Sequence, residues 1–263
     1  MKTKQLSESA IRSRLYENAR DVDIKLYSEI DSTNSEARRL SQKRKNGAVL
    51  IVAEQQSSGR GRLGRSFFSP AGAGIYMTYL WYPDAAAVDV VSVTTAASVA
   101  VLRAMKSIPT LAEKDLTIKW VNDIYLSGKK VCGILTEAIT DPEEGKVKSV
   151  WVGIGINVHQ TAFPEELAEI ATSLDVADLD RNELIANILN EWIAILQDLD
   201  PYAHMSYYRE HSLIIGKQVN TICAGVAVPG VVVDIDPQGG LVVRRSDGRI
   251  ETIHSGEVSL CFI

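Results

Sequence analysis

Cysteine is scarce in this chain of 263 residues. Cys132, Cys223 and Cys261 are widely spaced and form no C-x-x-C pair, which argues against a disulfide framework and against a structural zinc site. The four histidines show no metal-ligand spacing and are interpreted as structural. A chain with this cysteine usage fits a reducing compartment, so we expect a cytoplasmic protein.

Long apolar runs are also missing. The N-terminal twenty residues contain no apolar segment that would serve as a signal peptide, and no later run reaches about 18 uncharged apolar residues. We therefore expect a soluble protein that does not enter a membrane.

Positive charge is not in excess. The 28 basic and 33 acidic side chains give a formal net charge of −5, which disfavours a general nucleic-acid binder. A hydrophobic fraction of 46% is sufficient for a large core. The length allows one large domain, or one domain with a small appendage.

Two common phosphate-binding motifs are incomplete. The segment 59–66 reads G-x-x-x-x-G-R-S, so Arg65 replaces the lysine of a P-loop, and the following FFSPAG is turn sequence where a P-loop needs a helix. Gly153-Ile154-Gly155 lacks the third glycine of a dinucleotide fingerprint, because Val158 occupies that place. The sequence thus disfavours both a P-loop and a Rossmann site.

The segment 59–67, GRGRLGRSF, is the strongest functional signal, and we call it the arginine loop. Its three guanidinium groups stay charged and match phosphate or carboxylate oxygens in pairs. Its glycines, Gly59, Gly61 and Gly64, permit positive φ and close approach of a ligand. The alternative is a solvated basic turn. The loop follows an apolar strand and precedes two phenylalanines, which favours a site.

The rest of the pattern predicts an α+β protein with a mixed or antiparallel sheet packed with helices. A capping box at Thr33 and Glu36 opens a helix that extends to about Arg44. The other helices are expected within 5–20, over 88–105, over 183–199 as an amphipathic helix packed on one face, and from about 202. Strands are expected at 24–27, 48–53, 74–82, 116–121, 124–126, 131–139 and 147–158.

The sequence pattern changes at Gly216, from helix-length segments to short apolar runs. Short strands separated by Pro229-Gly230, Gly239-Gly240 and Asp247-Gly248 predict several hairpins in under fifty residues, which is typical of a small β-barrel. We therefore divide the chain into a domain over 1–215 and a small C-terminal domain over 216–263.

A second polar group follows the strand at 116–121. Lys119, Asn122 and Asp123 stand at its end, and Lys129 and Lys130 begin the return strand of the next hairpin. Lysines at a hairpin are usually solvated. Together with the arginine loop, however, this set offers several cations and one carboxylate, which suits a polyphosphate and Mg²⁺.

The whole pattern resembles the biotin protein ligases. The motifs that carry the resemblance are DSTN at 31–34, AEQQSSGRGRLGR at 53–65, KWVND at 119–123, KKVCGIL at 129–135 and GIGIN at 153–157. The segment 256–260, GEVSL, matches the end of that family's C-terminal domain. The resemblance implies a class II synthetase-like catalytic domain followed by a small Src-homology-3-like barrel.

The resemblance also implies a two-step reaction. Biotin and ATP form biotinyl-5′-AMP, and the biotinyl group is then transferred to a lysine of the biotin carboxyl carrier domain of a carboxylase. Some relatives carry an N-terminal winged helix and repress transcription, but only 30 residues precede Asp31 here, so we expect no DNA binding. Relatives often pair edge to edge through their sheets, and a homodimer is therefore an open option.

Carried over motif by motif, the resemblance assigns roles to individual residues. Lys130 is expected to be the main electrostatic catalyst, assisted by Arg62 and Arg65, while Lys129 is expected to be solvated. Gln56 is expected to face the ureido ring of biotin. The expected biotin-binding residues are Ser32, Thr33, Asn34, Gln56, Gly59, Arg60, Gly61, Arg62, Lys130, Gly133, Leu135, Gly153 and Gly155. The expected ATP-binding residues are Arg62, Arg65, Phe67, Asn122 and Asn157, with Asp123 as the magnesium ligand.

Strand alternation conflicts with one part of this assignment. Gly133 and Leu135 should lie on the face opposite Lys130, unless they act through their backbone or a bulge intervenes. The chain also departs from the family at Val121, Cys261 and Phe67, where proline, arginine and tryptophan are usual. Two rival hypotheses remain open at this point: a lipoate-type protein ligase and a non-catalytic carrier-binding module.

Overall fold

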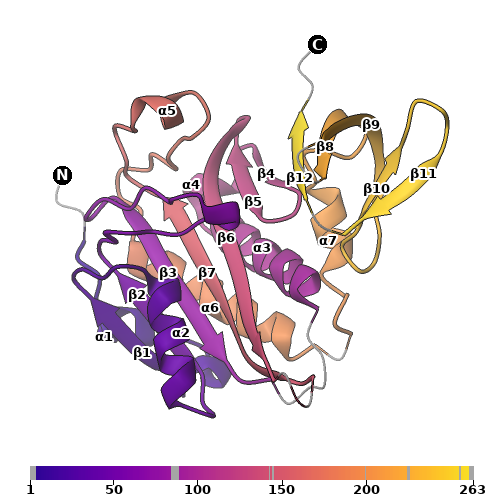
Figure 1. Ribbon diagram of the computed structural model, residues 1–263. Helices are drawn as coiled ribbons and strands as arrows, with labels where there is room; N and C mark the ends of the chain where they lie inside the picture. The colour runs from indigo at the N-terminus through magenta and orange to yellow at the C-terminus, as the bar shows by residue number, and fades with distance from the viewer. Residues whose placement is uncertain are drawn as a thin grey trace.

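The computed structural model describes residues 4–83, 89–141, 143, 145–198, 200–223, 226–254 and 256–260. Val88 and Leu199, where two predicted helices begin and end, lie outside these residues. Cys261, at which the chain departs from the family, also lies outside them. The polypeptide forms two separate sheets (Figure 1). The first contains β1 (Asp23–Tyr27), β2 (Val49–Ala53), β3 (Gly74–Trp81), β4 (Leu116–Lys119), β5 (Asp123–Leu126), β6 (Lys129–Thr140) and β7 (Val147–Asn157).

This seven-stranded sheet has the strand order β1-β2-β3-β7-β6-β5-β4. β1 and β2 run parallel, joined by a helical crossover, whereas the other neighbours pair antiparallel. The predicted α+β class with a mixed sheet is therefore confirmed. The three strands β3, β7 and β6 form its centre, and the predicted glycine-containing ends of β6 and β7 lie side by side there.

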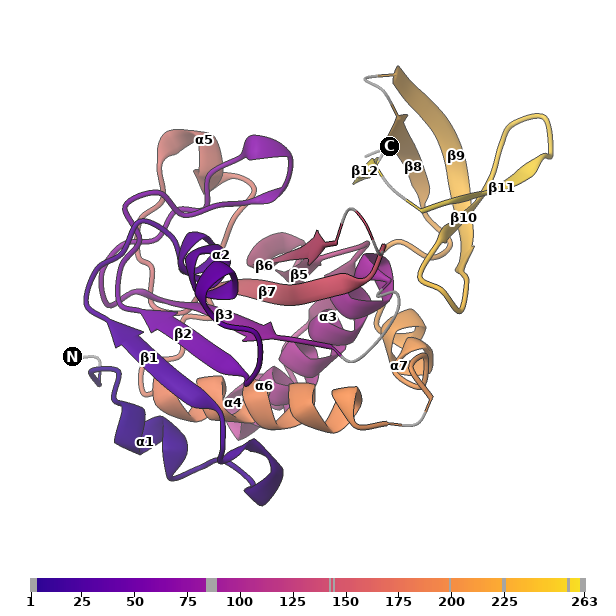
Figure 2. The ribbon, with the colours of Figure 1, turned by 60° about the horizontal axis from the view of Figure 1, so that its bottom comes forward.

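Helices cover both faces of the sheet (Figure 2). α2 (Thr33–Lys43) lies on one face, where Val49, Ile51 and Trp151 form a small apolar cluster with Ala37. α3 (Val90–Lys106) and α6 (Arg181–Leu196) lie on the opposite face over the main core. Because alternate residues of a strand point to opposite faces, the fully apolar β2 serves both cores. The remaining helices are α1 (Glu8–Arg12), α4 (Pro109–Ala112), α5 (Glu165–Ala168) and α7 (Met205–Glu210).

The start of α2 differs from the predicted capping box. Ser32 is the N-cap, with extended backbone, and its hydroxyl accepts a hydrogen bond from the Ser35 N–H at 3.5 Å. Thr33 is the first helical residue, and its hydroxyl is used elsewhere. The prediction placed the cap one residue too late, because both residues are good caps and only tertiary contacts distinguish them.

The prediction that α6 packs on one face is incomplete. Asn182 and Asn190 are buried as well as the apolar stripe. The Asn182 Oδ1 accepts from the Ser7 N–H at 2.8 Å, and the Asn190 Oδ1 accepts from the Tyr16 N–H at 2.9 Å. These amides therefore bind the N-terminal segment to the back of the domain.

The C-terminal sheet is antiparallel, with the order β11-β10-β9-β8-β12. Its strands are β8 (Gln218–Cys223), β9 (Val226–Ile235), β10 (Leu241–Arg244), β11 (Ile250–Ile253) and β12 (Glu257–Leu260). This agrees with the expected small barrel-like unit. The Trp120 Nε1–H donates to the Gly239 carbonyl at 2.8 Å, which joins the two sheets near the end of β4. Among the described residues no helix combines the length and the apolarity needed to cross a membrane.

Candidate active site

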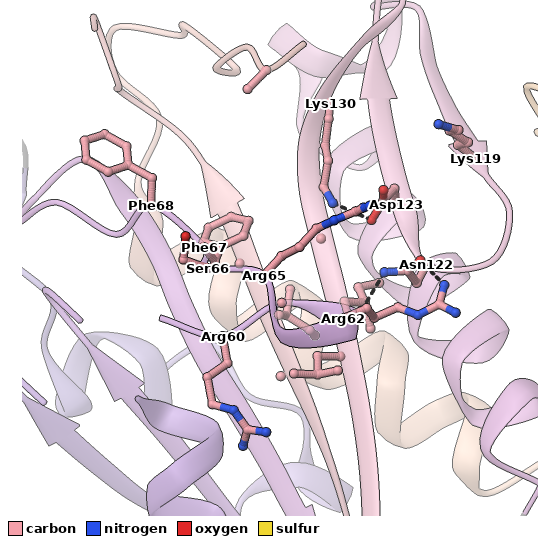
Figure 3. A pocket seen from close by; sticks show the side chains of 18 of the residues that line it. Arg60, Arg62, Arg65, Ser66, Phe67, Phe68, Lys119, Asn122, Asp123 and Lys130 are labelled. Atoms are coloured by element: carbon pink, nitrogen blue, oxygen red, sulfur yellow. Dashed lines mark hydrogen bonds and ion pairs between the residues drawn. The ribbon is translucent and has the colours of Figure 1, made fainter. Parts of the chain in front are cut away.

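A cavity of about 520 Å³ lies where the arginine loop, the sheet and the C-terminal strands meet. Figure 3 shows Arg62 and Arg65 of the arginine loop directed toward the side where Asn122, Asp123 and Lys130 lie, near the starts of β5 and β6. All the predicted site residues line this cavity except Gly59. The predicted residues that line it are Ser32, Thr33, Asn34, Gln56, Arg60, Gly61, Arg62, Arg65, Phe67, Asn122, Asp123, Lys130, Gly133, Leu135, Gly153, Gly155 and Asn157.

The arginine loop is closed by hydrogen bonds within its own backbone. The Gly61 N–H donates to the Arg65 carbonyl at 2.7 Å, and the Phe67 N–H donates to the Gly59 carbonyl at 2.9 Å. Of its three glycines only Gly64 has positive φ, at 76°, so the expectation of positive φ at Gly59 and Gly61 was wrong. Gly59 is needed for space, since a Cβ there would lie 2.4 Å from the Phe67 carbonyl oxygen.

Lys130 reaches the cavity because β6 contains a bulge. The pairing with β5 shifts between Ile124 and Tyr125, which face Cys132 and Lys130, so Val131 is the extra residue. The Lys130 Nζ consequently lies 3.1 Å from where a Cβ on Gly133 would be. The bulge thus removes the conflict between strand alternation and a common site for Lys130 and Gly133.

The Lys130 ammonium forms an ion pair with Asp123, with 2.7 Å between Nζ and Oδ1. The two side chains are 34% and 18% exposed, so they are only partly screened by solvent. Lys129, by contrast, donates to the Ala168 carbonyl at the surface and does not line the cavity. The two neighbouring lysines therefore occupy different environments, as the sequence analysis expected.

The loop arginines are held by different parts of the molecule. The Arg62 guanidinium donates to the Asn122 Oδ1 at 2.9 Å and to the Gly256 carbonyl of the C-terminal unit at 3.2 Å. Asn122 is itself anchored, because its Nδ2 donates to the Ile134 carbonyl at 2.8 Å. Arg62 thereby connects the loop, the end of β4 and the second sheet.

The predicted biotin wall is a connected polar group at the start of α2. The Gln56 Oε1 accepts from the Thr33 N–H at 2.9 Å and from its hydroxyl at 3.1 Å. The Gln56 Nε2 donates to the Ser69 hydroxyl at 2.9 Å. The Asn34 Nδ2 donates to the Leu135 carbonyl at 3.3 Å, which ties the start of α2 to β6. These contacts hold the wall rigidly in place.

Gly153 and Gly155 permit close approach, but the groups that approach them are protein side chains. A Cβ on Gly153 would lie 1.8 Å from the Asn34 Oδ1, and one on Gly155 would lie 2.6 Å from the Phe67 ring. The Phe67 ring therefore lies against Gly155 of β7, with its centroid 6.4 Å from that of Tyr76. Its position forms the cavity floor beside the loop.

Sequence reasoning missed the wall formed by residues 158–173. Asn157 donates its Nδ2 to the Thr172 carbonyl at 3.0 Å, and Lys130 exchanges backbone hydrogen bonds with Ile170 and Thr172. These contacts place Phe163, Leu167 and Ile170 against the cavity. The segment has no regular hydrophobic period, so it carried no signal. Gly256, Val258 and Ser259 were quoted in a motif but were not expected to line the site.

Tyr125 borders the cavity next to Asp123. Its hydroxyl accepts a hydrogen bond from the Lys119 Nζ at 3.2 Å. Burial raises the pKa of Tyr125, and the Asp123 charge acts in the same direction. The phenol therefore stays protonated at neutral pH and extends the polar lining beyond Lys130.

The donor set of the cavity fits a magnesium ion that is shared with a phosphate. The described residues contain no group of three or more His, Cys, Asp or Glu side chains that would hold a metal by themselves. Mg²⁺ commonly keeps several waters and uses one or two carboxylates together with substrate phosphates. Asp123 offers such a carboxylate inside the cavity.

A mixed sheet with a cationic loop over a cavity, bordered on one side by a small antiparallel sheet, is an arrangement typical of protein ligases. Comparison with known proteins agrees. Residues 26–157 match the model of the biotin/lipoate A/B protein ligase family, and residues 214–261 match that of the biotin protein ligase C terminal domain. The chain belongs to this family, as a biotin protein ligase.

Individual relatives support the same assignment. The chain is similar to the bifunctional ligase/repressor BirA of Bacillus spizizenii, with 34% identity over 97% of this chain and 79% of the relative. It is also 34% identical to the biotin–[acetyl-CoA-carboxylase] ligase of Mycobacterium tuberculosis, over 96% and 95% of the two chains. The biotin protein ligase from Aquifex aeolicus in complex with biotin and ATP superposes with a TM-score of 0.75 and 28% identity, over 91% and 98%.

Proposed function

We propose that this ligase joins biotin to ATP in the cavity and passes the biotinyl group to a lysine of a carboxylase's biotin carboxyl carrier domain. The observation that carries the proposal is the placement of Arg62, Arg65 and Lys130 around one cavity that also contains Asp123. In the first step a biotin carboxylate oxygen bonds to the α-phosphorus and pyrophosphate leaves. In the second the carrier lysine bonds to the acyl carbon and AMP leaves.

The first step needs cations because both reactants are anions. Lys130 lies on the bulge with its ammonium in the cavity, where it would reduce the repulsion between the carboxylate and the α-phosphate. Arg62 and Arg65 add fixed positive charge from the loop. Charges act more strongly in a site from which water is excluded, and the same exclusion protects the mixed anhydride from hydrolysis.

The polar wall and the glycines suit the biotin end of the cavity. Gln56, Thr33 and Ser32 offer fixed donors and acceptors for a ureido ring. The same space is lined by Gly61, Gly133, Leu135, Gly153 and Gly155. Arg60, Asn34 and Gly59 act indirectly, by holding the arginine loop and the sheet in position. Phe67 offers an aromatic face for the adenine. Asn157 acts by holding residues 158–173 in place.

Asp123 would hold Mg²⁺ together with the phosphates of ATP. When bound, the ion neutralises phosphate charge. Asp123 is also the ion-pair partner of Lys130, so the carboxylate that would hold the ion lies beside the ammonium that faces the substrates. Omission of Mg²⁺, with EDTA present, should therefore abolish biotin-dependent exchange of pyrophosphate into ATP.

We also propose a division into two domains, a homodimer and a cytoplasmic location. The boundary between a catalytic domain, 1–215, and a C-terminal domain, 216–263, rests on the change in sequence texture. A homodimer would use β1, which forms one edge of the larger sheet among the described strands. Sedimentation at several concentrations would test it. The cytoplasm is the compartment that the cysteine usage favours.

The direct test is incubation of the protein with radiolabelled biotin, Mg-ATP and an unmodified carrier domain. We expect label on the carrier with wild type and a rate lower by about 10²–10³ with Lys130→Ala, the range for loss of a fixed electrostatic group. Lys129→Ala is the matched control, because Lys129 is 43% exposed and lies outside the cavity. It should retain the wild-type rate.

Two results would contradict the proposal. A wild-type rate with Lys130→Ala would remove Lys130 from the mechanism. Labelling of the carrier with lipoate in preference to biotin would favour the lipoate-type rival, whereas binding of the carrier without any pyrophosphate exchange would favour a non-catalytic module.

A further inference from the structure

Arg60 departs from the other arginines of the loop. Figure 3 shows its side chain extending away from Lys130 and Asp123, whereas Arg62 and Arg65 point toward that end of the cavity. Its guanidinium meets Glu137 on β6, with 3.1 Å between Nη2 and Oε1 and 3.3 Å between Nη1 and Oε2. This paired geometry is the strong form of an arginine–carboxylate contact.

Side chains of the rigid part of the domain orient Glu137 for this contact. Its Oε2 also accepts from the Asn34 Nδ2 at 3.0 Å and from the Trp151 Nε1–H at 3.1 Å. Both donors belong to packed elements, α2 and β7, so they orient the carboxylate before the loop arrives. One carboxylate therefore receives two hydrogen bonds from the rigid domain and two from the loop.

Fixing Arg60 fixes the whole arginine loop. Arg60 and Ser66 form an isolated antiparallel bridge, and the bonds from Gly61 to Arg65 and from Phe67 to Gly59 close the same ring. Movement at Arg60 is therefore transmitted to Arg62 and Arg65. The contact with Glu137 lies on the side of the loop opposite the bond between Arg62 and Asn122, so the loop is held at two separate points.

We propose that Glu137 is a positioning residue of the ligase, which holds the arginine loop closed through Arg60 while Arg62 and Arg65 face the reactants. The inference rests on the proposed function and adds a residue to which no site role was assigned. The Arg60 and Glu137 side chains are 41% and 24% exposed, so water can replace each partner when the contact opens. This suits a loop that must open for substrates and close for chemistry.

The first experiment measures loop opening without activity. Trypsin cleaves after arginine, and the bonds from Arg60 to Glu137 and from Arg62 to Asn122 restrain the segment that contains its sites at Arg62 and Arg65. In ligand-free protein we expect Glu137→Gln to raise the cleavage rate at these two sites about five-fold, because the neutral amide cannot form the paired contact. Arg60→Gln should give a similar increase without altering Asn34 or Trp151. Mass spectrometry locates the cuts, and general unfolding would produce fragments from the whole chain.

The double variant and a control complete the test. If the two residues act only through each other, the Arg60→Gln/Glu137→Gln protein is cleaved no faster than either single variant. Glu169→Gln is the matched control, since Glu169 is 93% exposed and does not line the cavity. Its loop cleavage should equal that of wild type.

Pyrophosphate exchange then connects the loop to the reaction. We expect Glu137→Gln to raise the KM for biotin several-fold more than it lowers the rate at saturating biotin, because biotin binding can drive the loop closed. Unchanged cleavage in both single variants, or increases that add in the double variant, would overturn the proposal. Loss of biotin exchange in wild type would overturn the proposed function and leave the cleavage result intact.

Discussion

Two arginine–glutamate pairs on opposite faces of the sheet show how burial decides what such a pair does. Behind the sheet, Arg181 is 2% exposed and donates to Glu54 at 2.8 Å and to the Gly74 carbonyl at 3.0 Å. Above the cavity, Arg60 is 41% exposed and meets Glu137. Water cannot reach Arg181 to replace its partner but can reach Arg60, so the first pair stabilises the fold and the second can move.

The largest effect is expected from breaking the rear pair. Arg181→Met leaves Glu54 without its cationic partner, which we expect to lower the free energy of unfolding by roughly 3 kcal/mol. The low end of the range applies because the Glu54 side chain keeps 19% exposure. Urea unfolding measures the change, with Arg38→Met, an exposed arginine on α2, as control. Equal midpoints for the two variants would show that the rear pair is dispensable.

An intermediate effect is expected from a buried histidine behind the sheet. His204 is 2% exposed, its Nε2 lies 2.9 Å from the Thr95 hydroxyl, and burial together with the Arg103 charge lowers its pKa to about 4. The unfolded chain binds this proton near pH 6.5, so stability falls as the pH decreases from about 6.5 to 4.

Between pH 7 and pH 5 this histidine should account for a loss of roughly 2 kcal/mol. Denaturant unfolding at the two pH values measures the loss. His204→Gln should remove that part of the pH dependence whatever its effect on stability at pH 7, while His254→Gln, at an exposed position, should keep it. An unchanged pH dependence in His204→Gln would contradict the lowered pKa.

The smallest effect is expected from the pair above the cavity. Arg60→Gln should change the free energy of unfolding by less than about 1 kcal/mol, because both partners are partly solvated. The same variant is expected to open the arginine loop. A stability loss as large as that of Arg181→Met would abolish the distinction between the two faces.

The strands and long helices were accessible from local sequence. The apolar run of β2, the β-branched and aromatic β3 and the repeating apolar positions of α6 each predicted their element, because hydrophobic periodicity reflects which face is buried. The cap of α2 was displaced by one residue, since Ser32 and Thr33 are both capping residues and the Thr33 hydroxyl instead donates to Gln56.

The sequence predicted which residues belong to the candidate site better than it predicted the contacts between them. Five motifs named many of the residues that line the cavity, but Glu137 was absent because a glutamate on a strand carries no local signal of its partners. Asn34 and Gly153 line the cavity and also lie against each other, a contact that the sequence did not predict. Residues 158–173 were missed because they pack through backbone hydrogen bonds to Lys130.

The sequence by itself determined which chemistry was present: guanidinium groups on a glycine-rich loop, an ammonium group on a hairpin, a nearby carboxylate and an apolar core to support them. Those properties belong to residue types and their spacing. Only the tertiary structure decided that a bulge turns Lys130 into the cavity, and that Glu137 receives Arg60. The reason is that contacts between distant segments depend on sheet register and helix packing, which no local pattern encodes.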